Sequence, residues 1–315
     1  MVDVQQHIKQ IQSIPLFHDE PISIEPILKG YSNDMKYRVT YEQRPYLVKL
    51  FEERQFTAKQ EEYDVLGSLR QLGVNCSEPI ALGVNGLTGT GYLVLSYVEG
   101  EDASELLPHY SNSVQYRIGQ QAGRQLRLIH RIKAPPTMTS WDERKLNKHK
   151  RYLERYQSLE RSLKLSSDEQ IISFIEEHLH LMQGRPNLLQ HDDFHASNLI
   201  VKNEQLAGVI DFNRMDWGDP IHEFLKVGFF SVPVSIPFSI GQIRGYHGDQ
   251  EPTEHFWKLY SLYTAMSVIA SMVWITSVKP EESEQMLIRC EQVLEDHHHF
   301  ASVVPKWYVD HTGWL

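Results

Sequence analysis

The spacing of apolar residues along the chain changes near residue 100, from an alternating pattern to a helical one. Residues 35–41 (MKYRVTY) and 44–51 (RPYLVKLF) alternate on either side of a short polar turn, which predicts a β-hairpin. Residues 23–34 predict a strand that ends in a turn, and two more apolar runs, 78–84 (EPIALGV) and 91–98 (GYLVLSYV), predict two further strands. The first hundred residues are therefore expected to form a mostly antiparallel sheet.

Helical spacing dominates the rest of the chain. In the first part, only residues 1–14 and 57–74 repeat apolar side chains at helical spacing, and Gly73 is typical of a helix end. These patterns predict an α+β fold with two lobes: a small, β-rich N-terminal lobe over residues 1–98 and a larger, mainly helical C-terminal lobe over residues 99–315. The helices expected in the larger lobe cover residues 112–132, 142–164, 168–183, 253–276 and 281–297.

Composition and charge narrow the class of protein. The 315 residues are 41% hydrophobic and 23% charged, as in an ordinary globular protein, and the formal net charge is −10. An acidic chain argues against nucleic acid as a partner, because phosphate backbones are bound by clustered lysine and arginine. The two cysteines, Cys76 and Cys290, form no CxxC pair and are expected to be free, buried thiols.

Neither a signal peptide nor a membrane span is predicted. The first fourteen residues lack a basic stretch followed by an apolar one. The most apolar segment, residues 262–275, is too short to cross a bilayer and predicts a buried helix. The sequence therefore favours a cytoplasmic protein with no membrane partner, and it carries no indication of oligomeric state.

Ionisable and amide side chains crowd into residues 190–198 (QHDDFHASN), and a second acid, Asp211, follows an apolar run in residues 208–212 (GVIDF). Short strands are expected at 198–201 and 207–212, around these polar residues. His191 and His195 could suggest zinc, but no third nitrogen or sulfur ligand has a defined spacing. We expect both histidines to hydrogen-bond the loop backbone instead.

The order and spacing of the polar residues match the needs of phosphoryl transfer. A kinase uses an aspartate to orient the attacking hydroxyl, an asparagine five residues later as a metal ligand, and a second aspartate after a strand for the metal. Asp193, Asn198 and Asp211 stand in this order. Their oxygen atoms suit Mg²⁺, which also binds substrate phosphates. The sequence thus predicts Asp193 as the catalytic residue, with Asn198 and Asp211 as metal ligands.

The motif HDDFHASN, followed by VIDFNRMDWGDP, resembles the aminoglycoside phosphotransferase and choline kinase-like family. The resemblance implies a bilobal protein-kinase-like fold, ATP and Mg²⁺ as cofactors, and transfer of the γ-phosphoryl group to a hydroxyl of a small molecule. Two departures concern the shape of the loop: Asp192 stands where the family usually has glycine, and Ala196-Ser197 replaces a common Pro-Gly pair.

The same resemblance implies a nucleotide site in the small lobe. Lys49, on the third strand, would contact the ATP phosphates and pair with Glu62 on the following helix, with Glu61 as the second candidate. A turn between the first two strands would cover the phosphates, and the chain from Ser96 to Val98 would offer backbone groups to adenine. The further nucleotide-binding residues expected are Ser32, Asn33, Ser96 and Val98.

The phosphate acceptor stays open. A cationic aminoglycoside antibiotic could be attracted by acids of the large lobe, and the apolar residues of 224–275 could line a site for a macrolide. A metabolite kinase acting on choline, homoserine or a sugar is the alternative. The acids in question are Asp216, Glu223, Glu251, Glu254, Glu281 and Glu282.

Two other classes of protein are weighed against a small-molecule kinase. A protein kinase needs an activation loop, but only a short segment separates Asp211 from the WGDP motif. A non-catalytic nucleotide-binding module would not need the full set of Lys49, Asp193, Asn198 and Asp211. Both alternatives predict no phosphorylation of a small molecule.

Overall fold

The computed structural model describes residues 4–17, 22–28, 34–86 and 88–311. The chain divides into two compact units. The N-terminal unit comprises residues 1–100 together with 207–213, and the C-terminal unit comprises residues 101–206 and 214–315. Residues 207–213, which include Asp211, belong to the N-terminal unit. The boundary predicted at residue 98 did not assign them to it.

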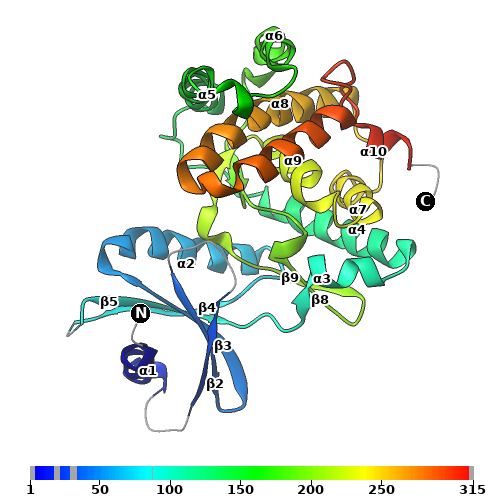
Figure 1. The fold of residues 1–315 in the computed structure, drawn as a ribbon. Helices are drawn as coiled ribbons and strands as arrows, with labels where there is room; N and C mark the ends of the chain where they lie inside the picture. Colours follow the sequence, from blue (N-terminus) through cyan, green and yellow to red (C-terminus); the bar gives the residue numbers. More distant parts are fainter. Residues whose placement is uncertain (1–3, 18–21, 29–33, 87, 312–315) are drawn as a thin grey trace. The chain divides into compact units, whose positions relative to one another are not determined.

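The N-terminal unit is built on a five-stranded antiparallel sheet (Figure 1). Its central hairpin turns at Glu42 and Gln43, whose φ values of 49° and 60° are those of the tight turn that suits the twist of two paired strands. The order of the strands across the sheet is β1 (Ser23–Ile27), β2 (Met35–Tyr41), β3 (Arg44–Glu52), β5 (Thr90–Ser96) and β4 (Pro79–Asn85). The antiparallel sheet predicted from the alternating pattern is confirmed.

Two helices accompany this sheet, α1 (Val4–Gln12) and α2 (Phe56–Gln71). Val48 and Leu50 on β3 belong to the same buried cluster as Ile11 of α1. Lys49, between them, pairs with Glu62 of α2. Because successive strand residues point to opposite faces, α1 and α2 lie on opposite faces of β3.

The C-terminal unit is mainly helical (Figure 1). The helices predicted from spacing are present, and most begin and end within a few residues of the expected limits. Helices α5 and α6 end earlier than expected. One long helix, α7, was not predicted. The helices are α3 (Ala103–Leu106), α4 (Asn112–Ile129), α5 (Trp141–Gln157), α6 (Asp168–His178), α7 (Ile236–Tyr246), α8 (Glu254–Val278), α9 (Ser283–Asp296) and α10 (Lys306–Val309).

Helices α4 and α7 pack so closely that side chains are excluded from their contact. A Cβ atom on Gly119 would lie 2.1 Å from the carbonyl oxygen of Phe238, and one on Gly123 would lie 2.1 Å from that of Gln242. Gly241 on α7 is equally close to the backbone of α4. Glycine weakens an isolated helix, so the tertiary contact rather than local propensity stabilises α7. That explains why its sequence did not predict a helix.

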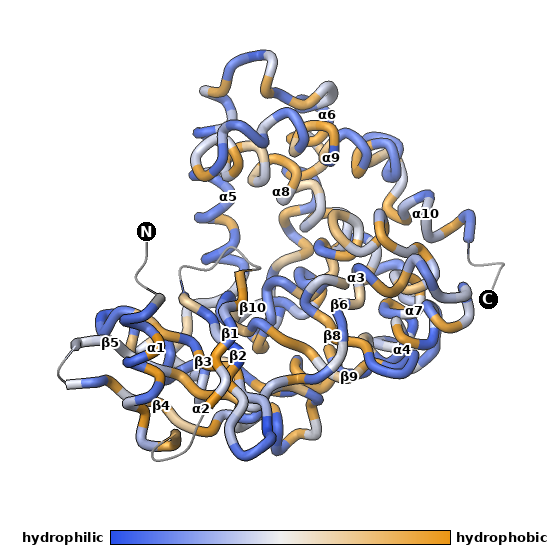
Figure 2. The backbone as a smooth tube through the Cα atoms, turned by 60° about the horizontal axis from the view of Figure 1, so that its bottom comes forward, coloured by the Kyte–Doolittle hydropathy of each residue, from blue (hydrophilic) through white to orange (hydrophobic). Residues whose placement is uncertain are grey.

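Helix α8 contains the apolar segment 262–275. Leu262, Tyr263, Ala265 and Ile269 are fully buried, which confirms the prediction of a buried helix. By length and composition alone its 25 residues could cross a membrane. Figure 2 shows hydrophobic residues, in orange, along α8. Most of its apolar side chains are buried, as in the core helix of a globular unit.

Short strands fix both ends of the polar loop at residues 191–198. Strand β7 (Leu188–Gln190) precedes the loop and pairs with β10 (Asp216–Gly218), and β8 (Leu199–Lys202) follows it and pairs with β6 (Glu101–Asp102). Strand β9 (Gln205–Val209) then carries the chain back into the N-terminal unit. There the backbone N–H of Val209 donates to the carbonyl oxygen of Asn75 over 2.8 Å.

Candidate active site

A buried glutamate holds the polar loop of the C-terminal unit in shape. The two carboxylate oxygens of Glu223 accept the backbone N–H groups of Asp192 (3.2 Å) and Phe194 (3.3 Å). Asp192 has a φ of 59°, in the left-handed region. This conformation favours glycine, and aspartate tolerates it better than most residues. The departure from the family's usual glycine at Asp192 is thus compatible with the loop's shape.

The two loop histidines also serve the backbone, as predicted. Nδ1 of His191 accepts the N–H of Asp193 over 3.2 Å, and Nδ1 of His195 accepts the N–H of Ser197 over 3.3 Å. Among the residues that the structure describes, no group of three His, Cys, Asp or Glu side chains is arranged to hold a metal. Through these two hydrogen bonds the histidines support the backbone of the loop.

Asp193 is surrounded by hydrogen-bond donors and positive charge. Lys226 Nζ lies 3.1 Å and His195 Nε2 lies 3.5 Å from Asp193 Oδ1, and Asn198 Nδ2 lies 3.3 Å from Oδ2. Burial alone would raise the pKa of the Asp193 carboxyl, but His195 and Lys226 outweigh it and hold this pKa well below its usual value. Asp193 is consequently an ionised acceptor that can orient a hydroxyl, although its low pKa makes it a weak base.

In the N-terminal unit, Lys49 and Glu62 form a buried ion pair, with 2.6 Å between Lys49 Nζ and Glu62 Oε1. Lys59 contacts the other oxygen of Glu62 over 3.2 Å and also pairs with Asp34. Burial would weaken both charges of the central pair, yet mutual attraction raises the pKa of Lys49 and lowers that of Glu62. Glu61, the second candidate, is exposed. The structure therefore brings Glu62, and not Glu61, to Lys49.

Asp211 lies beside two lysines of the same unit. Lys36 Nζ donates to Asp211 Oδ2 over 3.1 Å, and Lys49 Nζ lies 3.9 Å from Asp211 Oδ1. The predicted strand through residue 212 is wrong at its end, because β9 stops at Val209 and Asp211 has a left-handed φ of 67°. The turn aims the carboxylate at the two ammonium groups, which a continuing strand would not have done.

Lys36 was not predicted as a site residue. It stands directly opposite Lys49 in the register of β2 and β3. Two like charges at such positions repel each other, and a carboxylate between them removes the penalty. The signal that could have found Lys36 is the hairpin register itself, counted back from Lys49 across the turn. Glu223 and Lys226 were missed as partners of the loop because they come from a distant part of the chain.

The expected adenine-binding segment is only partly available. The backbone N–H of Ser96 donates to the carbonyl oxygen of Glu78 over 2.9 Å, and the Ser96 hydroxyl accepts the N–H of Glu78 over 2.7 Å. The described part of the chain shows no hydrogen bond to the backbone of Val98. Ser32 and Asn33, expected to cover the phosphates, lie outside the described residues.

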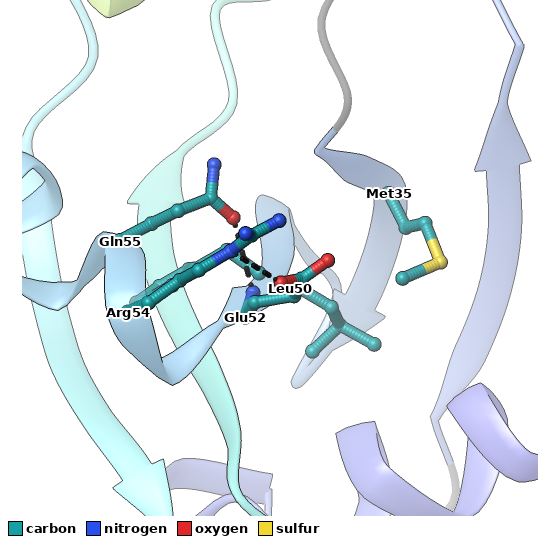
Figure 3. A pocket seen from close by; sticks show the side chains of 6 residues that line it. Met35, Leu50, Glu52, Arg54 and Gln55 are labelled. Atoms are coloured by element: carbon teal, nitrogen blue, oxygen red, sulfur yellow. Dashed lines mark hydrogen bonds and ion pairs between the residues drawn. The ribbon is translucent and has the colours of Figure 1, made fainter.

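A pocket of about 300 Å³ opens at the end of β3 in the N-terminal unit (Figure 3). Arg54 and Glu52 form an ion pair of 2.6 Å at its edge, and Gln55 accepts the backbone N–H of Glu52. None of the predicted site residues lines this pocket. Its lining consists of Met35, Leu50, Phe51, Glu52, Arg54 and Gln55.

The sheet of the N-terminal unit, the helical C-terminal unit and the Asp193, Asn198 and Asp211 pattern together define a kinase-like phosphotransferase. The chain belongs to the phosphotransferase enzyme family, whose sequence model matches residues 23–260. A search of curated proteins finds no match. The predicted family and the predicted class of enzyme, a small-molecule kinase, are confirmed.

Solved structures of aminoglycoside phosphotransferases share the fold. A mutant of aminoglycoside 2'-phosphotransferase-IIIa with GDP has a TM-score of 0.70 at 14% identity, covering 95% of this chain and 99% of that one. A thermostable mutant of APH(4)-Ia with ADP and hygromycin B has a TM-score of 0.66 at 13% identity, covering 92% and 97%. The gentamicin complex of APH(2")-IIa scores 0.59 at 16% identity, covering 96% and 98%. The predicted bilobal protein-kinase-like fold is confirmed.

Proposed function

We propose that the protein transfers the γ-phosphoryl group of ATP to a hydroxyl of a small molecule, with Asp193 as the residue that orients this hydroxyl. The observation that carries the proposal is the environment of Asp193. Its carboxylate is kept ionised by Lys226 and His195, on a loop that buried Glu223 holds in shape. A fixed, charged acceptor of this kind suits a reaction that depends on positioning.

On the nucleotide side, Lys49 would contact the ATP phosphates and Glu62 would keep Lys49 in place. Lys36 adds a second ammonium group directly across the hairpin. Lys49 is 2% exposed, so its ammonium group is presented by a rigid strand rather than by a mobile surface side chain. Adenine would be read by the backbone of Val98, because the N–H of Ser96 is already used within the sheet.

The residues present fit a Mg²⁺ ion bound mostly by the nucleotide. Asp211 and Asn198 would each supply an oxygen, and the Asn198 amide nitrogen is the end that contacts Asp193 (2.9 Å to the carbonyl oxygen), which leaves the amide oxygen for the metal. Mg²⁺ commonly uses one or two protein ligands with phosphates and water. When bound, the ion would neutralise charge on the phosphates.

In the reaction, the acceptor oxygen forms a bond to the γ-phosphorus and the bond from this phosphorus to the β-bridging oxygen breaks, releasing ADP. Because the transition state is loose, little proton transfer is needed early in the step. Asp193 accepts a hydrogen bond from the hydroxyl, directs its oxygen and takes the proton late. Its low pKa is compatible with this role.

The acceptor is proposed from the chemistry of the C-terminal unit. Solved relatives bind hygromycin B and gentamicin, so an aminoglycoside-type antibiotic is one candidate beside macrolides, choline, homoserine and sugars. Most of the acids expected to attract an aminoglycoside are engaged by neighbours, and Glu223 is buried under the loop. The engaged acids and their partners are Asp216 with Arg144, Glu251 with Arg244, Glu254 with Lys258 and Glu282 with Lys279.

The test is ADP release with Mg-ATP across a panel of aminoglycosides, macrolides, choline, homoserine, sugars and their acidic derivatives. We expect ADP release that depends on one class of acceptor. ATP binding without turnover on any acceptor would contradict the proposal and favour a non-catalytic nucleotide-binding module. Phosphorylation of serine or threonine in a peptide would instead favour a protein kinase.

Replacing Glu62 with glutamine is expected to lower kcat/KM for ATP roughly 10–100-fold, which corresponds to a charged hydrogen bond of about 1.5–3 kcal/mol. The substitution leaves buried Lys49 and Lys59 without the carboxylate that both contact. Steady-state kinetics at varied ATP concentration measures the effect. Glu61→Gln is the matched control, since this neighbouring side chain is exposed. Equal losses in both variants would argue against the role of Glu62.

A further inference from the structure

Three lysines gather beside the loop that carries Asp192 and Asp193, and we refer to Lys145, Lys148 and Lys226 as the lysine cluster. Lys145 and Lys148 come from α5, and Lys226 follows the WGDP segment. Lys145 and Lys148 stand three residues apart on α5, so their side chains lie on the same face of the helix. Burial first, and then the charges of Lys148 and Lys226, lower the pKa of Lys145 to about 7, against the opposing effect of Asp192 and Asp216.

The positive charge of the lysine cluster is incompletely neutralised. Lys226 pairs with Asp193, but the hydrogen bond of Lys145 goes to Nε2 of His222 over 2.8 Å. Burial and the nearby lysines lower the pKa of His222 well below its usual value, so this ring is neutral. Within the described ranges, neither Lys145 nor Lys148 has a carboxylate within 4 Å.

The acids that face the cluster balance only part of its charge. Asp193 pairs with Lys226, and the carboxylate of Asp192 lies 3.8 Å from His222, the hydrogen-bond partner of Lys145. Burial raises the pKa of Asp192 to about 6, so this carboxyl is still mostly ionised at neutral pH and offsets one charge of the cluster. Asp216 is paired with Arg144, and Glu223 is turned toward backbone N–H groups of the loop.

Further cationic and aromatic groups border the same part of the loop. Phe230 lies 5.0 Å from the ring of His195, and both Lys226 (5.5 Å) and Arg289 (5.2 Å) lie over its face. Trp141 lies 5.8 Å from the ammonium group of Lys145. A ligand here would meet apolar ring surface together with an excess of positive charge.

A bound anion would favour the charged form of Lys145, which burial disfavours, and would also attract the exposed ammonium group of Lys148. We propose that the phosphate acceptor carries a carboxylate or phosphate group, which Lys145 and Lys148 bind while the acceptor hydroxyl faces Asp193. This inference rests on the proposed function and selects among its acceptors. Polycationic aminoglycosides and choline would be repelled by the lysine cluster, whereas hydroxy acids and sugar phosphates would be attracted.

The first experiment measures binding, so that it does not depend on turnover. With Mg-AMP-PNP saturating the nucleotide site, calorimetric titrations compare D-gluconate, glucose 6-phosphate, glucose and kanamycin. We expect an anion to bind at least tenfold more tightly than glucose, and kanamycin not to bind. The gluconate and glucose 6-phosphate arms distinguish a carboxylate from a phosphate. Equal binding of the anions and glucose, or preferred binding of kanamycin, would overturn the inference.

The second experiment locates the charge recognition. Lys145→Met and Lys148→Gln are each expected to weaken binding of the preferred anion roughly tenfold. Lys150→Gln, at an exposed position of the same helix, is the matched control and should bind like the wild type. Unchanged anion binding in both cluster variants would overturn the assignment. Circular dichroism and AMP-PNP binding of each variant exclude loss of folding as the cause.

ADP release with the same compounds separates this inference from the proposed function. Turnover of an anionic acceptor supports both, and turnover of a neutral or cationic acceptor alone supports the function and overturns the inference. Anion binding at the lysine cluster without ADP release on any acceptor would keep the binding site and contradict the proposed function.

Discussion

Replacing Asp193 with alanine or asparagine is expected to lower kcat roughly 10²–10⁴-fold, while the affinity for Mg-ATP stays close to that of the wild type. The carboxylate is the only proposed contact with the attacking hydroxyl, and the contacts proposed for the phosphates and adenine of ATP come from Lys49 and Val98 rather than from Asp193. ADP release at saturating acceptor measures kcat, and titration with a fluorescent ATP analogue measures nucleotide affinity.

The Asp193 variants also leave Lys226 and His195 without their carboxylate. Thermal unfolding must therefore accompany the kinetics, so that a loss of loop structure is recognised. Ser197→Ala is the matched control, because it changes the same loop through a side chain with no hydrogen bond in the described structure. Wild-type turnover in Asp193→Asn would remove Asp193 from the reaction.

Much of the fold follows from local sequence patterns. The β2–β3 hairpin is readable because one face of each strand is buried, so that apolar residues such as Val39, Val48 and Leu50 alternate with polar ones. Helix α8 could be predicted from the sequence for another reason. A long apolar run that is buried in the unit must form its backbone hydrogen bonds within the run itself, as a helix does.

The parts that local patterns miss depend on tertiary contact. Helix α7 carries Gly241 and Gly245, which disfavour a helix locally and are required by the backbone of α4. Strands β7 and β10 have three residues each, and each is a strand only because the other is present. No sequence period records a pairing between segments this short and this far apart.

The same division applies to the candidate site. The spacing of Asp193 and Asn198 is local, and the two side chains meet within one loop, where Asn198 donates to Asp193. Lys226, which acts together with His195 to lower the pKa of Asp193, is 33 residues away along the chain. Sequence motifs thus predict which groups take part in the chemistry, and the fold determines the charges around them.

The second large effect is expected at Asp219, in the WGDP segment. Its buried carboxylate accepts hydrogen bonds from Arg185 (2.7 and 2.9 Å), from the hydroxyl of Tyr263 (2.7 Å) and from the N–H of Ile221 (3.0 Å). Its carbonyl oxygen accepts from Gln190, the residue before the loop. Asp219→Ala is expected to reduce the free energy of unfolding by about 3–5 kcal/mol, as for a broken buried ion pair.

Denaturant unfolding followed by circular dichroism measures this loss, and Asp249→Asn is the matched control. Asp249 also pairs with an arginine, Arg124, over 2.8 Å, but both side chains are about half exposed. Water screens such a pair, so its loss should cost about 0–1 kcal/mol. If Asp219→Ala were no less stable than Asp249→Asn, the support of the loop would have to come from the β7–β10 pairing and Glu223 rather than from Asp219.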